Sequence, residues 1–498
     1  MKDPSASASA GRAMYATLAA CILGIVLFCS LALPSHSIPS FELPAWTSRI
    51  TSDPSMLFRT SSSSSSSPTL LASTSCTASP TLLAEFGEHN LRRAQVHVGS
   101  GFRVQKFLQK AARGERVRVG VLGGSVSLGH GTDPRNGHRN KYGAVPHEAQ
   151  WHQLVLSHLE QTFPQADIEF VLGAKAATDS SFFEWCWPSL IGEDLDLVFV
   201  EMAVNDEFSN GMDASENLLR SLLNLDSEPA VLFVDFFALQ SGSAQKTILS
   251  GQDVQSSLAS WYDVPQISAR PALLQAMIRD PALAQPLFLG DLRHGTKIVH
   301  RFLGSMVVGY LQEERCRAER AGLEERKERR DEGVAEAWLG REGLGKVPPV
   351  KLNEGWNSKI EHPTKPPTCS VAGAGLEPVE PSPDWQLFNW KYSKFYFETT
   401  VPSSSEVVFA ADVRDGAQGL LAVSYLRSRQ YDLGKARCSV GAQEVTVDGS
   451  WTRSTSVAQT TIVARGLAPG RHEVRCRTLA RGKDGGGTAF RLMGVMTL

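Results

Sequence analysis

The sequence predicts a three-layer α/β domain built on a parallel sheet, followed by a C-terminal all-β sandwich and preceded by a single N-terminal transmembrane helix. Three observations predict this arrangement. Apolar runs alternate with helical periods from about residue 100 to 312, short β runs take over from about 385, and a long charge-free segment lies near the start. Alternation of the first kind is typical of a parallel sheet covered by helices.

Composition excludes several classes of protein. Lys plus Arg is 50 and Asp plus Glu is 52, which gives a net charge of −2 and argues against a nucleic-acid partner. Hydrophobic residues make up 42% of the chain, enough to bury a core. The length of 498 residues predicts two or three domains.

Residues 14–34 are expected to form a signal anchor. About 20 uncharged residues suffice to span a bilayer. Lys2 and Arg12 precede the segment, and no charged residue follows until Glu42. The positive-inside rule then places residues 1–13 in the cytoplasm and the rest of the chain in the lumen or outside the cell.

A cleaved signal peptide is the alternative, with Ser30-Leu31-Ala32 as the small-residue cleavage site. It would give a secreted protein rather than a single-pass type II membrane protein of the secretory pathway, in the Golgi or at the cell surface. Residues 35–83, with the serine run Ser61 to Ser67, are expected to form a disordered Ser/Thr-rich stalk. A stalk after a membrane anchor is typical of Golgi type II enzymes.

The cysteines beyond the predicted span are even in number, which suits disulfides in an oxidising compartment. We expect Cys438 to pair with Cys476, because both lie in the C-terminal β-rich region. Cys186 is interpreted as a structural half-cystine or buried thiol rather than a nucleophile. The six are Cys76, Cys186, Cys316, Cys369, Cys438 and Cys476.

Residues 84–315 are expected to form the α/β domain. Its apolar runs suit strands that are buried on both faces. They are Val117–Leu122, Ile168–Gly173, Leu195–Met202 and Ala230–Phe237. Helical stretches are predicted around Glu148–Phe163, around Ala214–Leu223 and from Lys297 onward.

A charged helix and a proline-rich connector are predicted over 316–384, and a β-sandwich over 385–498. Aromatic residues at the start of the sandwich are interpreted as core, with stacking on sugar rings as the alternative. These are Trp385, Trp390, Tyr392 and Tyr396. The predicted strands are Lys394–Thr399, Glu406–Val413, Leu420–Tyr425, Thr460–Ala464, His472–Arg477 and Phe490–Met496.

Ser125 is the candidate nucleophile. It follows Gly123 and Gly124 at the carboxyl end of the first apolar run, where parallel α/β sheets place their ligands. The segment contains no Lys, as a P-loop would require, and its adjacent glycines do not fit a dinucleotide fingerprint. The G-x-S-x-G elbow of α/β-hydrolases does not fit either, because Ser127 replaces its second glycine.

Two further fragments supply partners for the serine. Asn205 and Asp206 end the third apolar run, and Asp291 precedes His294 by three residues. In an Asp-x-x-His pair the carboxylate can hold imidazole Nδ1 while Nε2 faces a serine.

Other histidines receive less weight. His130 and Asp133 form a rival base pair just after the serine segment. His300 is interpreted as a helix residue that supports the site.

These fragments together resemble the SGNH (GDSL-type) hydrolase superfamily. The matching blocks are Gly123–Ser127, Ala203–Asp206 and Asp291–His294, and the resemblance covers about residues 115–312. The chain looks most like fungal-type membrane-anchored members with a C-terminal β-rich extension. It departs from the family at Gly124, where Asp is usual, and at Ala203, where Gly is usual. Ala177 is the best match to a further family glycine.

The resemblance implies a serine esterase with a catalytic triad of Ser125, His294 and Asp291. The oxyanion would be bound by the backbone N–H groups of Ser125 and Ala177 and by the side-chain amide of Asn205. No metal and no organic cofactor are implied. The expected substrate is a small acyl ester, with O-acetyl groups on carbohydrate preferred. An O-acyltransferase to a glycan, a lipid esterase and a non-catalytic glycan-binding surface protein remain the alternatives.

Overall fold

The computed structural model describes most of one compact unit, Thr69–Leu498. The described residues are 76–132, 148–206, 211–239, 248–328, 345–390, 394–401, 405–415, 418–452, 456–480 and 487–498. The predicted membrane span at 14–34 lies outside them. Within these ranges no helix has both the length and the apolar character that crossing a membrane requires.

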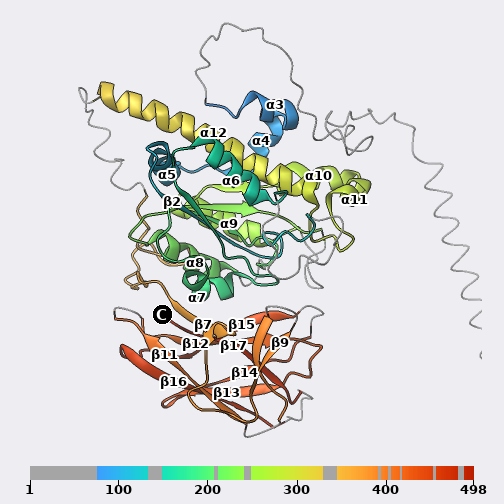
Figure 1. Ribbon diagram of the computed structural model, residues 1–498, viewed down its shortest axis with the longest axis vertical. Coiled ribbons are helices and arrows are strands. Elements are labelled where there is room, and N and C mark those ends of the chain that lie inside the picture. The colour runs from blue at the N-terminus through green and yellow to red at the C-terminus, as the bar shows by residue number, and fades with distance from the viewer. Residues whose placement is uncertain are drawn as a thin grey trace, which may run out of the picture. The chain divides into compact units, whose positions relative to one another are not determined.

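The α/β domain is built on a sheet of six strands in the order β1-β6-β5-β4-β2-β3. Figure 1 labels β2 of this sheet among the helices of the domain. All four predicted runs are strands of this sheet, and β3, β2, β4 and β5 pair in parallel as expected. The sheet is not wholly parallel, because the short β1 pairs antiparallel with β6 at one edge. The strands are β1 (Gln95–His97), β2 (Val117–Gly123), β3 (Ile168–Leu172), β4 (Leu197–Glu201), β5 (Ala230–Asp235) and β6 (Gln266–Ser268).

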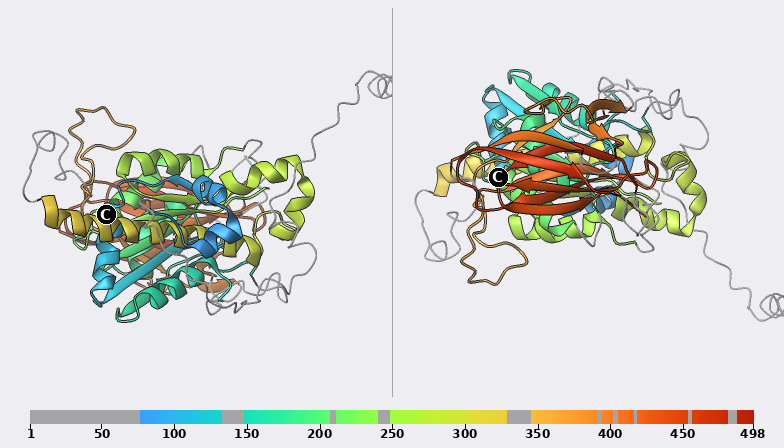
Figure 2. Two further views of the ribbon diagram at one scale, coloured as in Figure 1. Left: turned by 90° about the horizontal axis from the view of Figure 1, so that it is seen from above. Right: turned by 90° about the horizontal axis from the view of Figure 1, so that it is seen from below.

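Helices cover both faces of this sheet, as a three-layer fold requires. One face carries α5 (Phe102–Ala112), α6 (Trp151–Thr162) and α12 (Lys297–Glu328), and α12 is yellow in the view from above in Figure 2. The other face carries α7 (Ser180–Ile191), α8 (Met212–Leu223) and α9 (Gly251–Tyr262). Shorter helices complete the domain: α3 (Pro80–Phe86), α4 (Glu88–Ala94), α10 (Arg270–Arg279), the 3₁₀ helix Pro281–Leu283 and α11 (Ala284–Leu287).

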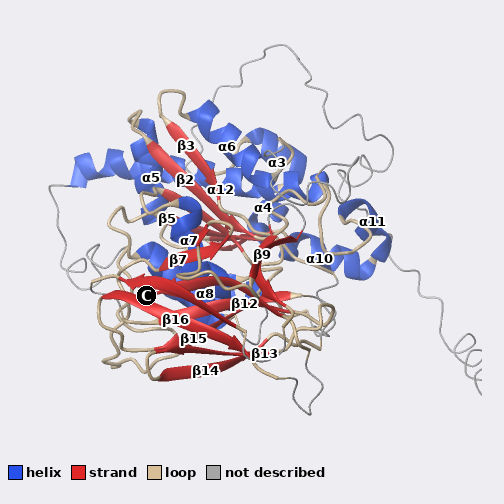
Figure 3. Ribbon diagram, turned by 60° about the horizontal axis from the view of Figure 1, so that its bottom comes forward, coloured by secondary structure: helices blue, strands red, loops and turns tan. Residues whose placement is uncertain are grey.

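The C-terminal region is a β-sandwich, as predicted, and its strands are red in Figure 3. Five strands of one sheet run in the order β15-β12-β17-β10-β9, with β7 beside β17 and β8 beside β7, and the second sheet has the order β11-β16-β13-β14. Cys438 on β13 bonds Cys476 on β16, which confirms the expected pair. The strands are β7 (Thr368–Ala372), β8 (Gly375–Leu376), β9 (Gln386–Trp390), β10 (Lys394–Thr399), β11 (Glu406–Val413), β12 (Leu421–Arg427), β13 (Lys435–Val440), β14 (Gln443–Asp448), β15 (Val457–Ala464), β16 (Gly470–Thr478) and β17 (Phe490–Thr497).

Three elements cross the boundaries that the sequence predicted. Helix α3 starts at Pro80, inside the expected stalk, and Cys76 before it is bonded to Cys316. Helix α12 runs through the boundary at residue 315 into the segment where the charged helix was predicted, and Cys316 and the buried Ala318 keep one of its faces against the domain. Strand β7 lies within the expected connector and pairs with β17. The sandwich therefore begins earlier than residue 385.

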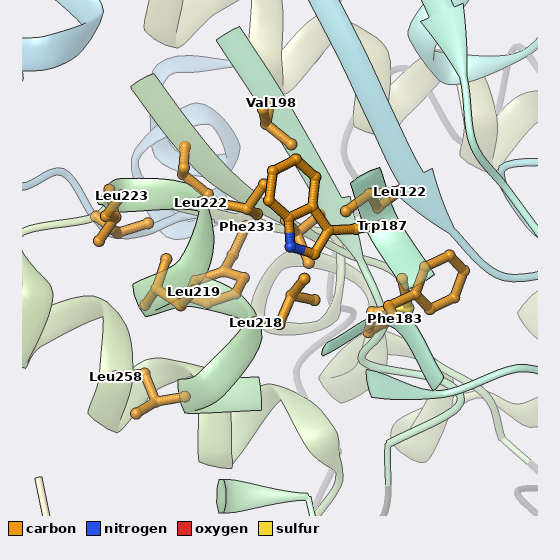
Figure 4. Packing of buried hydrophobic residues seen from close by; sticks show 14 of the residues in the cluster. Leu122, Phe183, Trp187, Val198, Leu218, Leu219, Leu222, Leu223, Phe233 and Leu258 are labelled. Atoms are coloured by element: carbon orange, nitrogen blue, oxygen red, sulfur yellow. The ribbon is translucent and has the colours of Figure 1, made fainter. Parts of the chain in front are cut away.

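The α/β domain and the sandwich share an apolar core. Figure 4 shows its centre, where Trp187 of α7 is fully buried among leucines of α8. Ala422 and Met496 of the sandwich belong to the same cluster and are also fully buried. Cys186 of α7 forms a disulfide with Cys369 of β7, so it is a structural half-cystine as predicted. Covalent and apolar contacts thus fix the sandwich to α7.

Removal of this disulfide tests the shared core. Replacing Cys186 and Cys369 by alanine is expected to lower the free energy of unfolding by about 2–5 kcal/mol, because the bond constrains a long loop of the unfolded chain. Both domains should still unfold in one transition, since the apolar contacts of Met496 remain. Differential scanning calorimetry without reductant measures this, with the Cys438/Cys476 double-alanine variant as a control inside one domain. An unchanged midpoint, or two separate transitions in the wild type, would contradict the shared core.

Candidate active site

The structure brings Ser125, His294 and Asp291 together in one hydrogen-bonded chain. Ser125 directly follows the glycines that end β2, and the other two residues lie in the turn before α12. Ser125 Oγ is 2.7 Å from His294 Nε2, and His294 Nδ1 is 2.6 Å from Asp291 Oδ2. Because a carboxylate only accepts, Nδ1 carries the proton and Nε2 is left to accept from the serine hydroxyl. This is the order of contacts that a serine nucleophile requires.

Asp291 is held in place by its own turn. Its Oδ1 accepts hydrogen bonds from the backbone N–H groups of Arg293, at 3.0 Å, and His294, at 3.1 Å. Partial burial raises the pKa of Asp291, but the hydrogen bonds from the His294 side chain and from these two amides outweigh it and leave the pKa below its ordinary value. The carboxylate therefore stays ionised and can stabilise a protonated imidazole.

The Asp-x-x-His turn is closed by backbone contacts. Leu289 N–H donates to His294 O at 2.8 Å, and Leu292 has the left-handed φ of 52°. Gly295 has no room for a side chain, because a Cβ there would lie 2.1 Å from the Phe236 ring. A cavity of about 550 Å³ borders the turn, and the described residues that line it do not include Ser125, His294 or Asp291. Its lining is mostly apolar: Leu239, Met277, Ile278, Pro281, Ala284, Gln285, Phe288, Leu289, Gly290 and Leu292.

Gly124 explains one departure from the family pattern. A Cβ at this position would lie 2.3 Å from Asn205 Oδ1. The family's usual Asp could not stand here without moving Asn205. The missing side chain lets the amide of Asn205 approach the backbone directly beside Ser125, which suits its predicted part in the oxyanion hole.

Asp206, the neighbour of Asn205, has a structural role. Its carboxylate accepts hydrogen bonds from Ser180 N–H at 2.8 Å, from Ser180 Oγ at 2.7 Å and from Ser215 Oγ at 3.0 Å. Gln255 Nε2 on α9 donates to it at 3.3 Å. Burial raises its pKa to about 6. Asp206 thus joins α7, α8 and α9 to the end of β4.

Ala177 lies in the loop between β3 and α7. This loop is tied to the serine strand, since Gly173 N–H donates to Val121 O and Lys175 N–H donates to Gly123 O, both at 2.8 Å. Ala177 has a φ of 56°, in the left-handed region that glycine adopts most easily. The conformation is therefore one that would suit a glycine at this position. The donation of the Ala177 N–H to an oxyanion stays a prediction.

The rival base His130 lies beside His294. The His130 ring lies 5.0 Å from the His294 ring between centroids, and His130 N–H donates to Ser125 O at 3.0 Å. Asp133 lies outside the described residues. His300 is buried in α12, where its Nδ1 accepts from Trp151 N–H at 3.4 Å, and burial lowers its pKa to about 3. It is a helix residue, as predicted, and its support of the site stays a prediction.

The aromatic residues of the sandwich follow the core interpretation. Trp385 and Tyr396 are only 5% and 4% exposed. Trp390 is half-buried and meets Tyr431 edge-on, with 6.2 Å between ring centroids. Tyr392 lies outside the described residues.

Sequence reasoning missed a buried group behind the serine. Glu201 Oε2 at the end of β4 accepts hydrogen bonds from Ser127 N–H at 3.3 Å and from Ser127 Oγ–H at 3.0 Å. Trp151 and His152 of α6 also bind Ser127. The sequence does show Glu201 as an acidic residue at the end of the otherwise apolar strand LVFVE, and this could have indicated a buried acid near the site.

The described residues contain no group of three or more His, Cys, Asp or Glu side chains arranged to hold a metal ion.

The chain matches no protein-family model and no curated protein sequence. Among solved structures it is similar to a two-domain esterase (CEX) active on acetylated mannans, co-crystallized with mannopentaose, at 16% identity and a TM-score of 0.55. That match covers 82% of this chain and 97% of the other. A further structure of a two-domain esterase (CEX) active on acetylated mannans matches at 15% identity and a TM-score of 0.53, over 82% of this chain and 98% of the other. The likeness confirms the predicted combination of an α/β domain and a C-terminal β-rich domain.

The backbone of Ala177 gives a test of the predicted oxyanion loop. Ala177→Gly is expected to keep full activity and to stabilise the protein slightly, because a left-handed non-glycine residue costs about 1–2 kcal/mol while glycine loses about 0.4–1 kcal/mol through the unfolded chain. Ala177→Val should destabilise the fold and lower the rate of ester hydrolysis, since a β-branched residue tolerates this φ poorly.

Denaturant unfolding and initial rates measure both effects, with Ala176→Val as the neighbouring control. Equal behaviour of the two valine variants would contradict the assigned conformation.

Proposed function

We propose that the chain is an SGNH-type serine esterase that hydrolyses small acyl esters. The observation that carries the proposal is the hydrogen-bonded chain from Ser125 Oγ through His294 to Asp291 at the carboxyl edge of the sheet. The blocks around these residues resemble the same superfamily in sequence.

The geometry supports an acyl-enzyme mechanism. His294 Nε2 takes the proton of Ser125 Oγ as the oxygen attacks the ester carbonyl carbon, and Asp291 stabilises the imidazolium. The negative oxygen is met by the N–H groups of Ser125 and Ala177 and by the amide of Asn205. His294 then returns the proton to the leaving alcohol. Water, deprotonated by the same imidazole, cleaves the acyl-enzyme, so that the acid is released and Ser125 is restored.

O-acetyl groups on a polysaccharide are the proposed substrate. The structures with the same two-domain fold are those of esterases active on acetylated mannans, and one was obtained with mannopentaose. Identities of 15% and 16% show the fold alone, so the substrate is carried over as a proposal. Release of acetate from acetylated mannan, compared with acetylated xylan and with long-chain acyl esters, tests it. A preference for long acyl chains would point to a lipid esterase instead.

We also propose that the chain works in the secretory pathway, as a single-pass type II membrane protein or after cleavage of a signal peptide. The three disulfides among the described residues support an oxidising compartment, because such bonds are rare in the cytosol. Immunolocalisation together with protease protection of the α/β domain tests the compartment and the orientation. Cytosolic exposure of that domain would contradict the proposal.

Ser125 gives the primary test of the reaction. The purified full chain is expected to hydrolyse p-nitrophenyl acetate, and Ser125→Ala should lower kcat by more than about 10³-fold, because the variant lacks the hydroxyl oxygen that His294 activates. Ser250→Ala, outside the site, serves as a serine control with wild-type turnover. Undiminished turnover in Ser125→Ala would contradict the assignment of Ser125 as the nucleophile.

Asn205 tests the oxyanion hole. Asn205→Ala is expected to lower kcat by about 10²- to 10³-fold with little change in KM, since the amide is needed where charge develops rather than in the ground state. Asn90→Ala is the matched control, because its side chain bonds only Phe86 O among its described hydrogen bonds. A loss confined to KM would assign Asn205 to substrate binding instead.

A further inference from the structure

Every polar atom of Ser127 makes a hydrogen bond. Its N–H and its hydroxyl both donate to Glu201 Oε2, at 3.3 and 3.0 Å. Its Oγ accepts from Trp151 Nε1–H at 3.2 Å, and its carbonyl oxygen lies 2.8 Å from His152 Nε2. The residue is fully buried, so it anchors the nucleophile turn two residues after Ser125.

The end of β4 also binds the residue that precedes Ser125. Gly124 N–H donates to the backbone oxygen of Glu201 at 3.3 Å. A Cβ at Gly123 would lie 2.3 Å from Ser127 Oγ, so the turn has no room to shift toward β2. Glu201 therefore contacts the residues on both sides of Ser125, through its backbone before the serine and through its carboxyl group after it.

The environment of Glu201 disfavours a negative charge. The residue is fully buried, and Oε1 has no hydrogen-bond partner among the described residues. Burial raises its pKa to about 8, although hydrogen bonds from Ser127 and Gly124 oppose the rise and Asp206 adds repulsion. A neutral carboxyl group still accepts both bonds from Ser127.

The other titratable groups around Glu201 do not supply a compensating positive charge. Asp206 lies in the turn that follows β4, and Asp235 at the end of β5 is a buried acid that also repels Glu201. Burial lowers the pKa of His152, on the far side of Ser127, to about 4. Burial also lowers the pKa of His300 to about 3. Both histidines are neutral in the pH range where Glu201 titrates.

We propose that Glu201 is a positioning residue of the esterase: a neutral, buried carboxyl group that acts through Ser127 to hold Ser125 in line with His294. The inference rests on the proposed function. An ionised Glu201 would bury a charge without a cation and with one oxygen unbonded, which costs several kcal/mol unless the surroundings rearrange. Rearrangement would move the nucleophile turn, because Ser127 is its anchor.

Two substitutions in the full chain test the role of Glu201, with p-nitrophenyl acetate as substrate. Glu201→Gln keeps the shape and the acceptor oxygen but cannot ionise. It should keep wild-type kcat near neutral pH and lose the decline of kcat that the wild type shows as pH rises through about 8. Glu201→Leu should lower kcat by about 10²-fold with KM unchanged, because a displacement of about 1 Å costs that much in rate.

Asp235→Asn is the matched control. Asp235 is another buried acid with a raised pKa at the same sheet edge, but its described hydrogen bond goes to Gln266 Nε2 at 2.5 Å and not to the serine turn. It should retain an alkaline limb, displaced toward lower pH to the extent that the Asp235 charge repels Glu201. An alkaline limb that persists in Glu201→Gln, or is lost equally in Asp235→Asn, would overturn the inference while Ser125-dependent turnover still supports the function. Absence of Ser125-dependent turnover in the wild type would overturn both.

Stability gives a second readout, independent of turnover. The folded pKa of Glu201 is raised from 4.5 to about 8, so its contribution is fully present below 4.5 and is lost as pH rises through about 8. Between about pH 5 and pH 9 the wild type should therefore lose unfolding free energy relative to Glu201→Gln. Denaturant unfolding at the two pH values measures this, and also shows whether Glu201→Leu is folded. An equal pH dependence of the unfolding free energy in wild type and Glu201→Gln would contradict a neutral Glu201.

Discussion

The close approach of the ends of β2 and β4 is the constraint on which the site depends. Gly123 and Gly124 carry no side chains, and the space that a Cβ would fill is taken by Ser127 at one glycine and Asn205 at the other. The two strands can therefore bring a nucleophile and an amide donor to one point. A side chain at Gly123 would have to displace Ser127, and one at Gly124 would have to displace Asn205.

This arrangement places acids where water cannot reach them. Glu201, Asp206 and Asp235 are buried at the ends of β4 and β5, and burial raises the pKa of each. Such groups cost free energy unless they are neutral or well bonded. Asp206 is well bonded to three helices, whereas Glu201 leaves one oxygen without a described partner. The fold thus tolerates an unfavourable environment at the residue that holds the serine turn.

The sequence was most informative where pattern and chemistry coincide. Continuous apolar runs identified the four parallel strands, and the order of Ser125, Asn205, Asp291 and His294 identified the residues that meet at their carboxyl edge. It was least informative where burial is decided by distant partners. Strand β9 is largely exposed, and β14 carries alternating polar residues, so neither shows an apolar run. Glu201 was missed because the sequence does not show that a strand-end acid faces Ser127 rather than solvent.

The sandwich is part of the framework of the site and not a separate appendage. Met496 and Ala422 fill the core beneath α7, and the Cys186–Cys369 bond fixes that helix to β7. Helix α7 begins at Ser180, where Asp206 binds it, and the loop that leads into it carries Ala177. Loss of the sandwich would expose the apolar face of α7 and loosen the start of the helix. The position of the predicted oxyanion donor therefore depends on a domain that contributes none of Ser125, His294 and Asp291.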